Sequence, residues 1–346
     1  MNRTPLLLLI GVFFSANALA QAPKYSNEFL SIGVGARGLA MSKAQVASVN
    51  DLTSAYWNPA GLVEIKDNLQ VGAQHAEYFA GIAKYDYGAV AINTDRKSGM
   101  AFSFLRFGVD DIPNTTDLID QNGRVNYDRI TSFSAADYAF LFSYARQLGP
   151  EGLSVGGNAK VIYRQVGDMA NAWGFGLDVG AQYKLNDWRF GVIGRDITST
   201  FNAWSFNLDE RTIEVFEATN NEIPQNGVEV TLPKLSLGAA RSWRIKEKFG
   251  VLAEVNFDVT TDGKRNVLVS GDPFSIDPNV GLELDYQGII FLRAGLGNFQ
   301  RIKAEVGDYY EYTMQPNVGI GVNIKETLSI DYALTDIGDQ SVALYS

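Results

Sequence analysis

The side chains that could carry catalysis in this chain are few and scattered. The chain contains one histidine, His75, and no cysteine. A zinc site is built from several Cys, His or carboxylate ligands, and His75 has no cysteine or second histidine to join it. His75 lies on a candidate strand between Gln74 and Glu77, which favours a structural or interfacial role. The sequence therefore predicts a protein that is not an enzyme and that holds neither a cofactor nor a metal ion.

Carboxylates and arginines alternate with apolar residues in several segments. Two of the carboxylates could in principle form the catalytic pair of a glycosidase. The alternative, which we favour, is that paired charges fill the interior of a barrel, where ionisable groups meet one another and not lipid. The acidic candidates are Glu254, Asp258, Glu283 and Asp285, and the basic ones are Arg164, Arg195 and Arg293.

The stretch from Gly33 to Gly38 has the G-x-G-x-x-G spacing of a dinucleotide-binding loop. That motif has meaning only after a strand and inside a βαβ unit, and both are missing here. We interpret these glycines as positions where the backbone passes close to a barrel wall. The sequence thus predicts no nucleotide site.

The clearest structural signal is alternation between apolar and small or polar residues. In 172–184, Trp173, Phe175, Leu177, Val179 and Tyr183 fall on one face. Successive side chains of a strand point to opposite faces, so this segment predicts a two-faced strand. A membrane barrel turns the apolar face to lipid and the polar face to its lumen. The 41 aromatic residues suit the aromatic girdles of such a barrel.

The links between the candidate strands indicate a membrane barrel and not a soluble sandwich. Links after even-numbered strands are short, whereas 109–135, 197–231, 262–275 and 299–313 are long and all follow odd-numbered strands. Outer-membrane barrels have short periplasmic turns, long outer loops and an even number of strands. We predict an all-β, 14-stranded antiparallel transmembrane barrel with these strands: 69–76, 82–92, 99–108, 136–146, 152–165, 172–184, 187–196, 232–244, 248–261, 276–286, 288–298, 314–324, 326–335 and 341–346.

The first 20 residues have the pattern of a signal peptide. Arg3 supplies the positive charge, an apolar run follows, and Ala20 and Gln21 flank the expected cleavage site. We expect three parts: the signal peptide 1–20, an N-terminal hatch segment 21–67 and the barrel 68–346.

The long links are rich in acidic residues, and the whole chain carries a net charge of −10. This charge argues against nucleic acid as a partner. Three interpretations of the acidic loops remain open: solvated loop surfaces, calcium-binding carboxylates and a partner surface. No loop has the spacing of an EF-hand. The absence of cysteine means that no disulfide stabilises the chain.

The residues from Phe29 to Leu62, FLSIGVGARGLAMSKAQVASVNDLTSAYWNPAGL, carry a family resemblance. The segment is similar to the N-terminal hatch of FadL-like outer-membrane proteins, which contains an Asn-Pro-Ala motif. Within that superfamily, GARGLAM followed by YWNPAGL resembles the PorV/PorQ branch of the type IX secretion system. The matching motif positions are Gly35, Arg37, Gly38, Tyr56, Trp57, Asn58, Pro59, Ala60 and Gly61.

The resemblance implies a short hatch inside a FadL-like barrel in the outer membrane of a Gram-negative bacterium. It implies a non-enzymatic component of the type IX protein secretion and sorting machinery, with other machinery proteins or secreted cargo as partners besides membrane lipid. The alternative is a passive FadL-like transporter of hydrophobic small molecules. By resemblance, Asn58 to Gly61 form the turn of the hatch that leads into the first strand.

Overall fold

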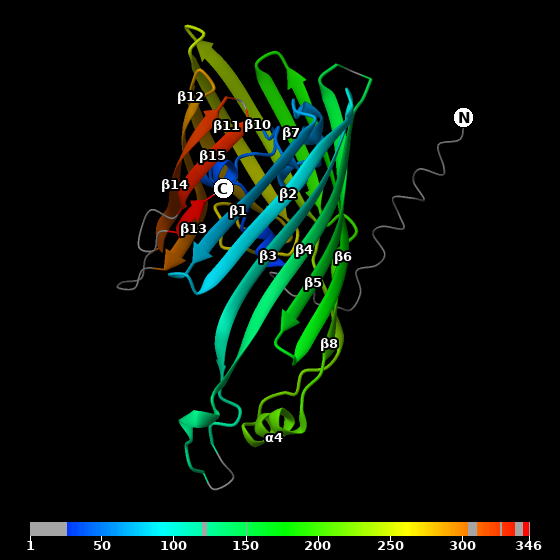
Figure 1. Ribbon diagram of the computed structural model, residues 1–346, viewed down its shortest axis with the longest axis vertical. Helices are drawn as coiled ribbons and strands as arrows, with labels where there is room; N and C mark the ends of the chain where they lie inside the picture. The colour runs from blue at the N-terminus through cyan, green and yellow to red at the C-terminus, as the bar shows by residue number, and fades with distance from the viewer. Residues whose placement is uncertain are drawn as a thin grey trace, which may run out of the picture.

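The computed structural model describes residues 26–119, 123–149, 151–303, 310–325, 327–335 and 342–345, and it is an upright antiparallel barrel (Figure 1). The expected signal peptide, with its cleavage site between Ala20 and Gln21, lies outside the described residues and stays a prediction. Among the described residues, no helix is long and apolar enough to cross a membrane.

The strands alternate in direction along the chain. Their bounds are β1 (Leu69–Tyr78), β2 (Ala83–Asp95), β3 (Ser98–Asn114), β4 (Thr131–Gln147), β5 (Leu153–Val166), β6 (Ala170–Leu185), β7 (Trp188–Arg195), β8 (Phe201–Phe206), β9 (Gly227–Val230), β10 (Lys234–Ile245), β11 (Phe249–Thr260), β12 (Ser275–Tyr286), β13 (Ile290–Lys303), β14 (Tyr310–Ile324), β15 (Leu328–Thr335) and β16 (Val342–Tyr345).

The strands close into a ring. Each strand pairs with its neighbour in sequence from β1 to β7 and from β10 to β16, and β7 pairs with β10. The ring closes through β1 and β16, where His75 pairs with Tyr345 and Ala76 with Leu344. Among the described residues the ring thus has fourteen strand positions, which confirms the fold expected from the sequence. Closure matters because lipid cannot satisfy the hydrogen bonds of an open strand edge.

The strands β8 and β9 continue two of these fourteen positions. Both β7 and β8 pair with β6, but Gly194 is opposite Val179 whereas Phe201 is opposite Phe175. Residues 196–200 therefore form an insertion that interrupts the ladder. The neighbouring strand position, which β9 and β10 form together, is interrupted at 231–233. The wall of the barrel is irregular at this height, and the candidate site lies there.

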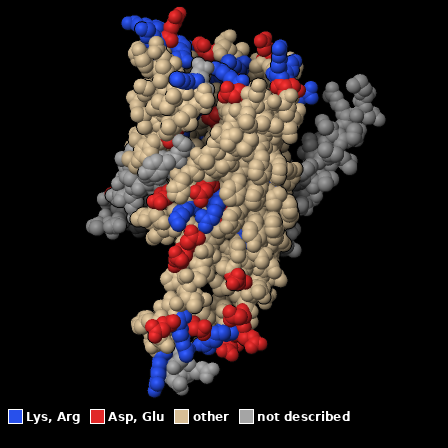
Figure 2. Space-filling model, viewed as in Figure 1, with Lys and Arg blue, Asp and Glu red and all other residues tan. Residues whose placement is uncertain are grey.

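The two faces of the wall differ as the alternation predicts. On β6, Trp173, Phe175, Leu177 and Val179 are exposed, whereas Asp178 is buried inside the ring. Figure 2 shows uncharged residues over most of the visible barrel surface, with charges gathered at its two ends and in one group at mid-height. Large apolar side chains that face outward in a closed barrel are the surface of a protein that spans a membrane.

Short turns lie at one end of the ring and long loops at the other. The turns β2–β3 and β6–β7 span only 96–97 and 186–187. The prediction that 197–231 is one long loop is wrong, because it contains β8, the helix α4 (Glu210–Ala218) and β9. The link after β3 is shorter than predicted and contains the 3-10 helix η3 (Tyr127–Arg129). Both segments extend beyond the barrel at the lower end of Figure 1.

The N-terminal segment lies inside the ring as a hatch. Its elements are η1 (Glu28–Ser31), α2 (Ala36–Ala40), α3 (Ser54–Trp57) and η2 (Pro59–Glu64). Side chains of the hatch, such as Val34 and Tyr56, form one buried cluster with Tyr85, Leu105 and Ile162 of the wall. The core of the protein is therefore the contact between the hatch and the barrel wall.

Small residues of the wall allow the hatch backbone to lie against it. A Cβ atom on Gly156 would stand 2.7 Å from Ala60 N, and one on Gly295 would stand 2.4 Å from the carbonyl carbon of Met41. Such distances are below any normal contact, so these positions require glycine. Other inward glycines that touch the hatch in this way are Gly72, Gly99, Gly180, Gly191, Gly281 and Gly319.

The hatch's own glycines leave room within the hatch, although Gly35 N also donates to Gln74 of the wall. A Cβ atom on Gly33 or Gly38 would meet Trp57, and one on Gly35 would meet Thr53, both within the hatch. The close approach to the wall is made instead by wall glycines, which the alternation showed only as small residues on the lumen side.

Candidate functional site: the contact between hatch and wall

An ion-pair chain anchors the hatch to β12 and its neighbours. Arg37 Nε lies 2.8 Å from Glu283 Oε2, and Arg37 Nη2 donates to Glu283 Oε1 at 3.2 Å. Glu283 also accepts from Arg293 Nε at 2.6 Å, and Arg293 is paired with Asp331. A forked arginine–carboxylate pair fixes orientation as well as distance. These charges inside the ring are paired with one another, as the barrel-interior interpretation predicted.

A second carboxylate of the wall binds the backbone of the hatch. The Glu254 side chain accepts hydrogen bonds from Ala47 N at 2.8 Å and from Ser48 N at 3.1 Å, and it is fully buried. A carboxylate satisfies two backbone donors at once here. Glu254 therefore holds a stretch of the hatch that has no helix of its own.

Asn58 connects three parts of the structure and is completely buried. Its Nδ2 donates to Val46 O at 2.9 Å and to Ala181 O at 3.1 Å, and its Oδ1 accepts from Ala60 N. Asn58 is thus the N-cap of η2, and Pro59 occupies the first helical position, which needs no N–H donor. The motif, which was expected to form the turn of the hatch before the first strand, begins a 3-10 helix there. Gly61 is needed for packing, since its Cβ would stand 2.4 Å from Val49 O.

The two aromatic residues of the motif pack the hatch together. The rings of Tyr56 and Trp57 meet edge to face with centroids 4.8 Å apart. Trp57 Nε1 donates to Val34 O at 2.9 Å, and the Tyr56 hydroxyl donates to Leu30 O. Gly35 N in turn donates to Gln74 of β1.

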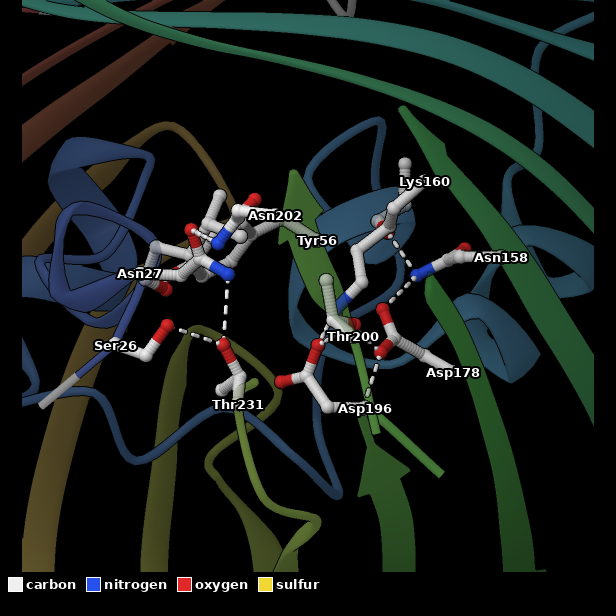
Figure 3. Close-up of polar contacts among 12 residues, drawn as sticks. Ser26, Asn27, Tyr56, Asn158, Lys160, Asp178, Asp196, Thr200, Asn202 and Thr231 are labelled. Atoms are coloured by element: carbon white, nitrogen blue, oxygen red, sulfur yellow. Dashed lines mark hydrogen bonds and ion pairs between the residues drawn. The ribbon is translucent and has the colours of Figure 1, made fainter. Parts of the chain in front are cut away.

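A buried charge cluster lies where the wall is interrupted (Figure 3). Lys160 Nζ is 2.8 Å from Asp178 Oδ1 and 2.6 Å from Asp196 Oδ1. Asp178 also accepts from Asp196 N and from Asn158 Nδ2, and Thr200 donates to Asp196. The insertion 196–200 is therefore drawn inward by side chains of β5 and β6, which explains why the wall bends at this point.

The first described residues of the hatch clasp the same interruption (Figure 3). Asn27 Nδ2 donates to Thr231 Oγ1 at 2.7 Å, and Thr231 Oγ1 donates to Ser26 Oγ at 2.8 Å. Asn202 Nδ2 donates to Asn27 Oδ1 at 3.0 Å. Asn27 has a positive φ of 54°, a conformation that asparagine tolerates better than most residues. Three neutral hydrogen bonds thus hold this end of the hatch against β8 and the 231–233 break.

A cavity of about 60 Å³ separates the charge cluster from this clasp. Its lining includes Leu30 and Tyr56 of the hatch and Leu141, Lys160, Arg195 and Thr231 of the wall. The Arg195 guanidinium lies over the Tyr56 ring, 4.6 Å from its centroid. The cavity is lined by both apolar and charged groups, and the hatch forms one of its sides.

The structure gathers some of the predicted residues and adds others. Glu254, Glu283, Arg195 and Arg293 face the lumen as expected. Asp258 and Asp285 lie on the same faces of β11 and β12 as Glu254 and Glu283, and they pair with Lys234 and with the exposed Arg244 at the short-turn end. The motif residues Gly35, Gly38 and 56–61 are buried, and Arg37 is partly buried.

The sequence reasoning missed the cluster of Lys160, Asp178 and Asp196. Lys160 and Asp178 stood on the polar faces of two predicted strands, which was the available signal. It also overlooked a G-x-S-x-G spacing from Gly152 to Gly156. Ser154 lies inside strand β5 and not at a strand-to-helix turn, so this spacing is no nucleophile elbow.

Comparisons with known proteins agree on the fold. No protein-family model matches the sequence, and no curated protein matches it. Among solved structures, the chain is similar to the CymD monoaromatic hydrocarbon channel (13% identity, 91% of this chain and 95% of that one, TM-score 0.52). It is also similar to the toluene transporter TbuX of Ralstonia pickettii (12% identity, 90% of this chain and 97% of that one, TM-score 0.50). The toluene transporter TodX of Pseudomonas putida is a third similar structure (13% identity, 90% of this chain and 96% of that one, TM-score 0.53). The chain therefore has the fold of a FadL-like outer-membrane barrel with an internal hatch.

Proposed function

We propose that this protein is a passive transporter in the outer membrane of a Gram-negative bacterium and that it carries small hydrophobic molecules. The exposed apolar belt around a closed barrel supports the membrane location. The barrels of similar fold are named as a monoaromatic hydrocarbon channel and as toluene transporters, which supports the substrate class.

The observation that carries this proposal is the wall interruption beside a cavity. At 196–200 and 231–233 the ladder of the wall is broken, and residues 26–31 of the hatch lie behind the break. A hydrophobic solute can leave a barrel sideways into lipid only where the wall is not continuous, because continuously hydrogen-bonded strands leave no opening.

The hatch has to move for a solute to pass. A cavity of about 60 Å³ is smaller than the ~150 Å³ of an apolar cavity that binds benzene. Residues 26–31 are held to this part of the wall by the neutral hydrogen bonds around Asn27 and Thr231 and by an ion pair of 3.2 Å between Glu28 and Arg265. The hatch that follows is held by the charged chain at Arg37 and Glu283. We infer that residues 26–31 move while the remainder of the hatch stays in place.

Uptake of radiolabelled toluene tests this function. The protein is produced in outer membranes of a host that lacks its own hydrocarbon channels, and the initial uptake rate is compared with that of the empty host. We expect faster, non-saturating uptake with the protein present. Equal rates, with the folded barrel shown to be in the outer membrane, would overturn the proposal.

The type IX secretion role implied by the hatch motif is a second candidate. The observation in its favour is that the two long outer segments are ordered against each other: Arg211 of α4 lies 3.1 Å from Asp117 and donates to Ile119 O. Ordered outer loops suit a protein partner. Affinity purification from mildly solubilised outer membranes decides this point, because a sorting role requires other machinery proteins or secreted cargo in the eluate.

A further inference from the structure

Arg241 of β10 lies on the lipid side of the barrel wall. Side chains alternate between the two faces of a strand, so every second residue of β10 shares the face of Arg241. The large residues of that face are all exposed and apolar: Leu235, Leu237, Trp243 and Ile245. Because apolar side chains stand on both sides of Arg241 along the strand, its charge lies within the apolar belt.

Arg241 lies in the belt near the short-turn end. In the ladder it is paired with Trp188, the first residue of β7. The adjacent Ser242 N donates to Asp187 O of the turn between β6 and β7 at 2.9 Å. Exposed aromatic side chains gather on this part of the wall: Trp188, Phe190, Trp243, Phe249 and Tyr286. Such aromatic residues mark the membrane–water interface, so Arg241 lies at the depth of the lipid headgroups.

Two indole rings flank the guanidinium of Arg241. Its Cζ lies 5.1 Å from the ring centroid of Trp188 and 5.2 Å from that of Trp243. A cation over the face of an indole is attracted to it. Arg241 Nε is buried without a hydrogen-bond partner, whereas the two terminal nitrogens are not enclosed. The rings therefore hold the side chain and leave its outer edge open.

No carboxylate among the described residues forms an ion pair with Arg241. Arg244, on the opposite face of the same strand, lies 2.9 Å from Asp285 Oδ1. An arginine does not lose its proton in a protein, so Arg241 stays charged. A charge on the lipid face of a barrel is unfavourable unless it meets an opposite charge. The anion available at the headgroup level is the phosphate of a phospholipid.

We propose that Arg241, Trp188 and Trp243 form a binding site for one phospholipid of the periplasmic leaflet, the leaflet beside the short turns. The terminal nitrogens of Arg241 donate to oxygens of the lipid phosphate, for which a planar guanidinium is well suited. The small outward residues Ala239 and Ala253 lie directly beside Arg241 and leave room for an acyl chain. The site lies outside the ring and does not involve the hatch.

Native mass spectrometry of the full barrel in an uncharged detergent tests the site. The delipidated protein is titrated with dioleoylphosphatidylglycerol, and the fraction that carries one lipid gives the affinity. Arg241→Gln should lower this affinity roughly tenfold or more, because the charged contact with phosphate is lost. Arg244→Gln, on the other face of the same strand, is the matched control and should leave the affinity unchanged. Equal affinities of wild type and Arg241→Gln, or an equal loss in the control, would overturn the proposal.

Two further ligands identify what the site recognises. Dioleoylglycerol has the same acyl chains without phosphate, and it should bind wild type and Arg241→Gln equally weakly. Inorganic phosphate at the concentration of the lipid should not displace the lipid, because the chains also contribute to binding. Tight binding of dioleoylglycerol, or displacement by inorganic phosphate, would contradict a phospholipid site.

A conservative variant separates charge from shape. Arg241→Lys keeps the positive charge and should bind the lipid more tightly than Arg241→Gln does. Heat-modifiable mobility on gels shows that each variant is a folded barrel. Equal lipid affinities of the Lys and Gln variants would show that the charge does not hold the lipid.

Discussion

The guanidinium of Arg37 forms a forked contact with the carboxylate of Glu283, and this carboxylate also binds Arg293. The hatch and two wall strands thus share one negative charge. Glu283→Gln leaves two arginines without that charge and should weaken the attachment of the hatch by about 3–5 kcal/mol. Arg37→Gln should cost less, because Glu283 keeps Arg293. Limited proteolysis of the hatch in detergent measures how strongly each variant loosens it. Equal protease sensitivity of the two variants would contradict the shared-charge arrangement.

Gly156 is predicted to control how closely the hatch lies against the wall. Gly156→Ala places a methyl group 2.7 Å from the backbone of Pro59 and Ala60. Contact at this distance is too close, so either β5 or η2 has to move. We expect faster amide hydrogen exchange in η2, with the barrel strands still protected. Gly149→Ala, in an exposed turn with no atom within 4 Å of its Cβ, is the control and should leave exchange unchanged. Unchanged exchange in both would show that the contact is not tight.

Leu177 and Gln182 test the assignment of outside and inside. Leu177→Arg puts a charge on the lipid face and should cost the barrel about 2–4 kcal/mol near the middle of the bilayer. Gln182 faces the lumen, where it is buried and donates to Val46 O and Val49 O of the hatch, so Gln182→Arg disturbs the hatch contact. It should loosen the hatch and leave the barrel ladder intact. Urea unfolding of the barrel in lipid vesicles separates the two effects, and equal losses of barrel stability would reverse the face assignment.

The helix α4 in the outer loops should depend on pH through Asp209. Asp209 is its N-cap, and the hydrogen bond from Thr212 N at 2.7 Å lowers the pKa of the carboxyl below its usual value of about 3.9. Because its pKa is lowered in the folded state, ionised Asp209 stabilises the helix at every pH above the usual pKa of the carboxyl. This stabilisation is lost as the pH falls through the lowered pKa. Proteolysis of α4 should therefore rise as pH falls below about 4, and Asp209→Asn should remove the pH dependence. A pH profile that is identical in the variant would refute this role.

The barrel could be predicted from the sequence because its rules are local. Alternation along single strands and the contrast between short and long links were enough to predict fourteen positions, with boundaries close to those of β1 and β6. The break at 196–200 was missed, since β8 has only six residues and the contacts of Lys160 and Asp178 with Asp196 join separate strands. The contact between Arg37 and Glu283 joins residues 246 positions apart, and no local pattern predicts it.

The central claim is that residues 26–31 close the wall interruption and that their release lets hydrophobic molecules pass. Thr231→Val removes the hydroxyl that accepts from Asn27 and donates to Ser26. Thr313→Val on β14, whose side chain does not line the described cavity, is the matched control. The measurement is the initial rate of toluene uptake by cells with equal amounts of folded barrel. Faster uptake for Thr231→Val than for both wild type and Thr313→Val is the predicted result, and a rate equal to or below that of wild type would contradict the claim.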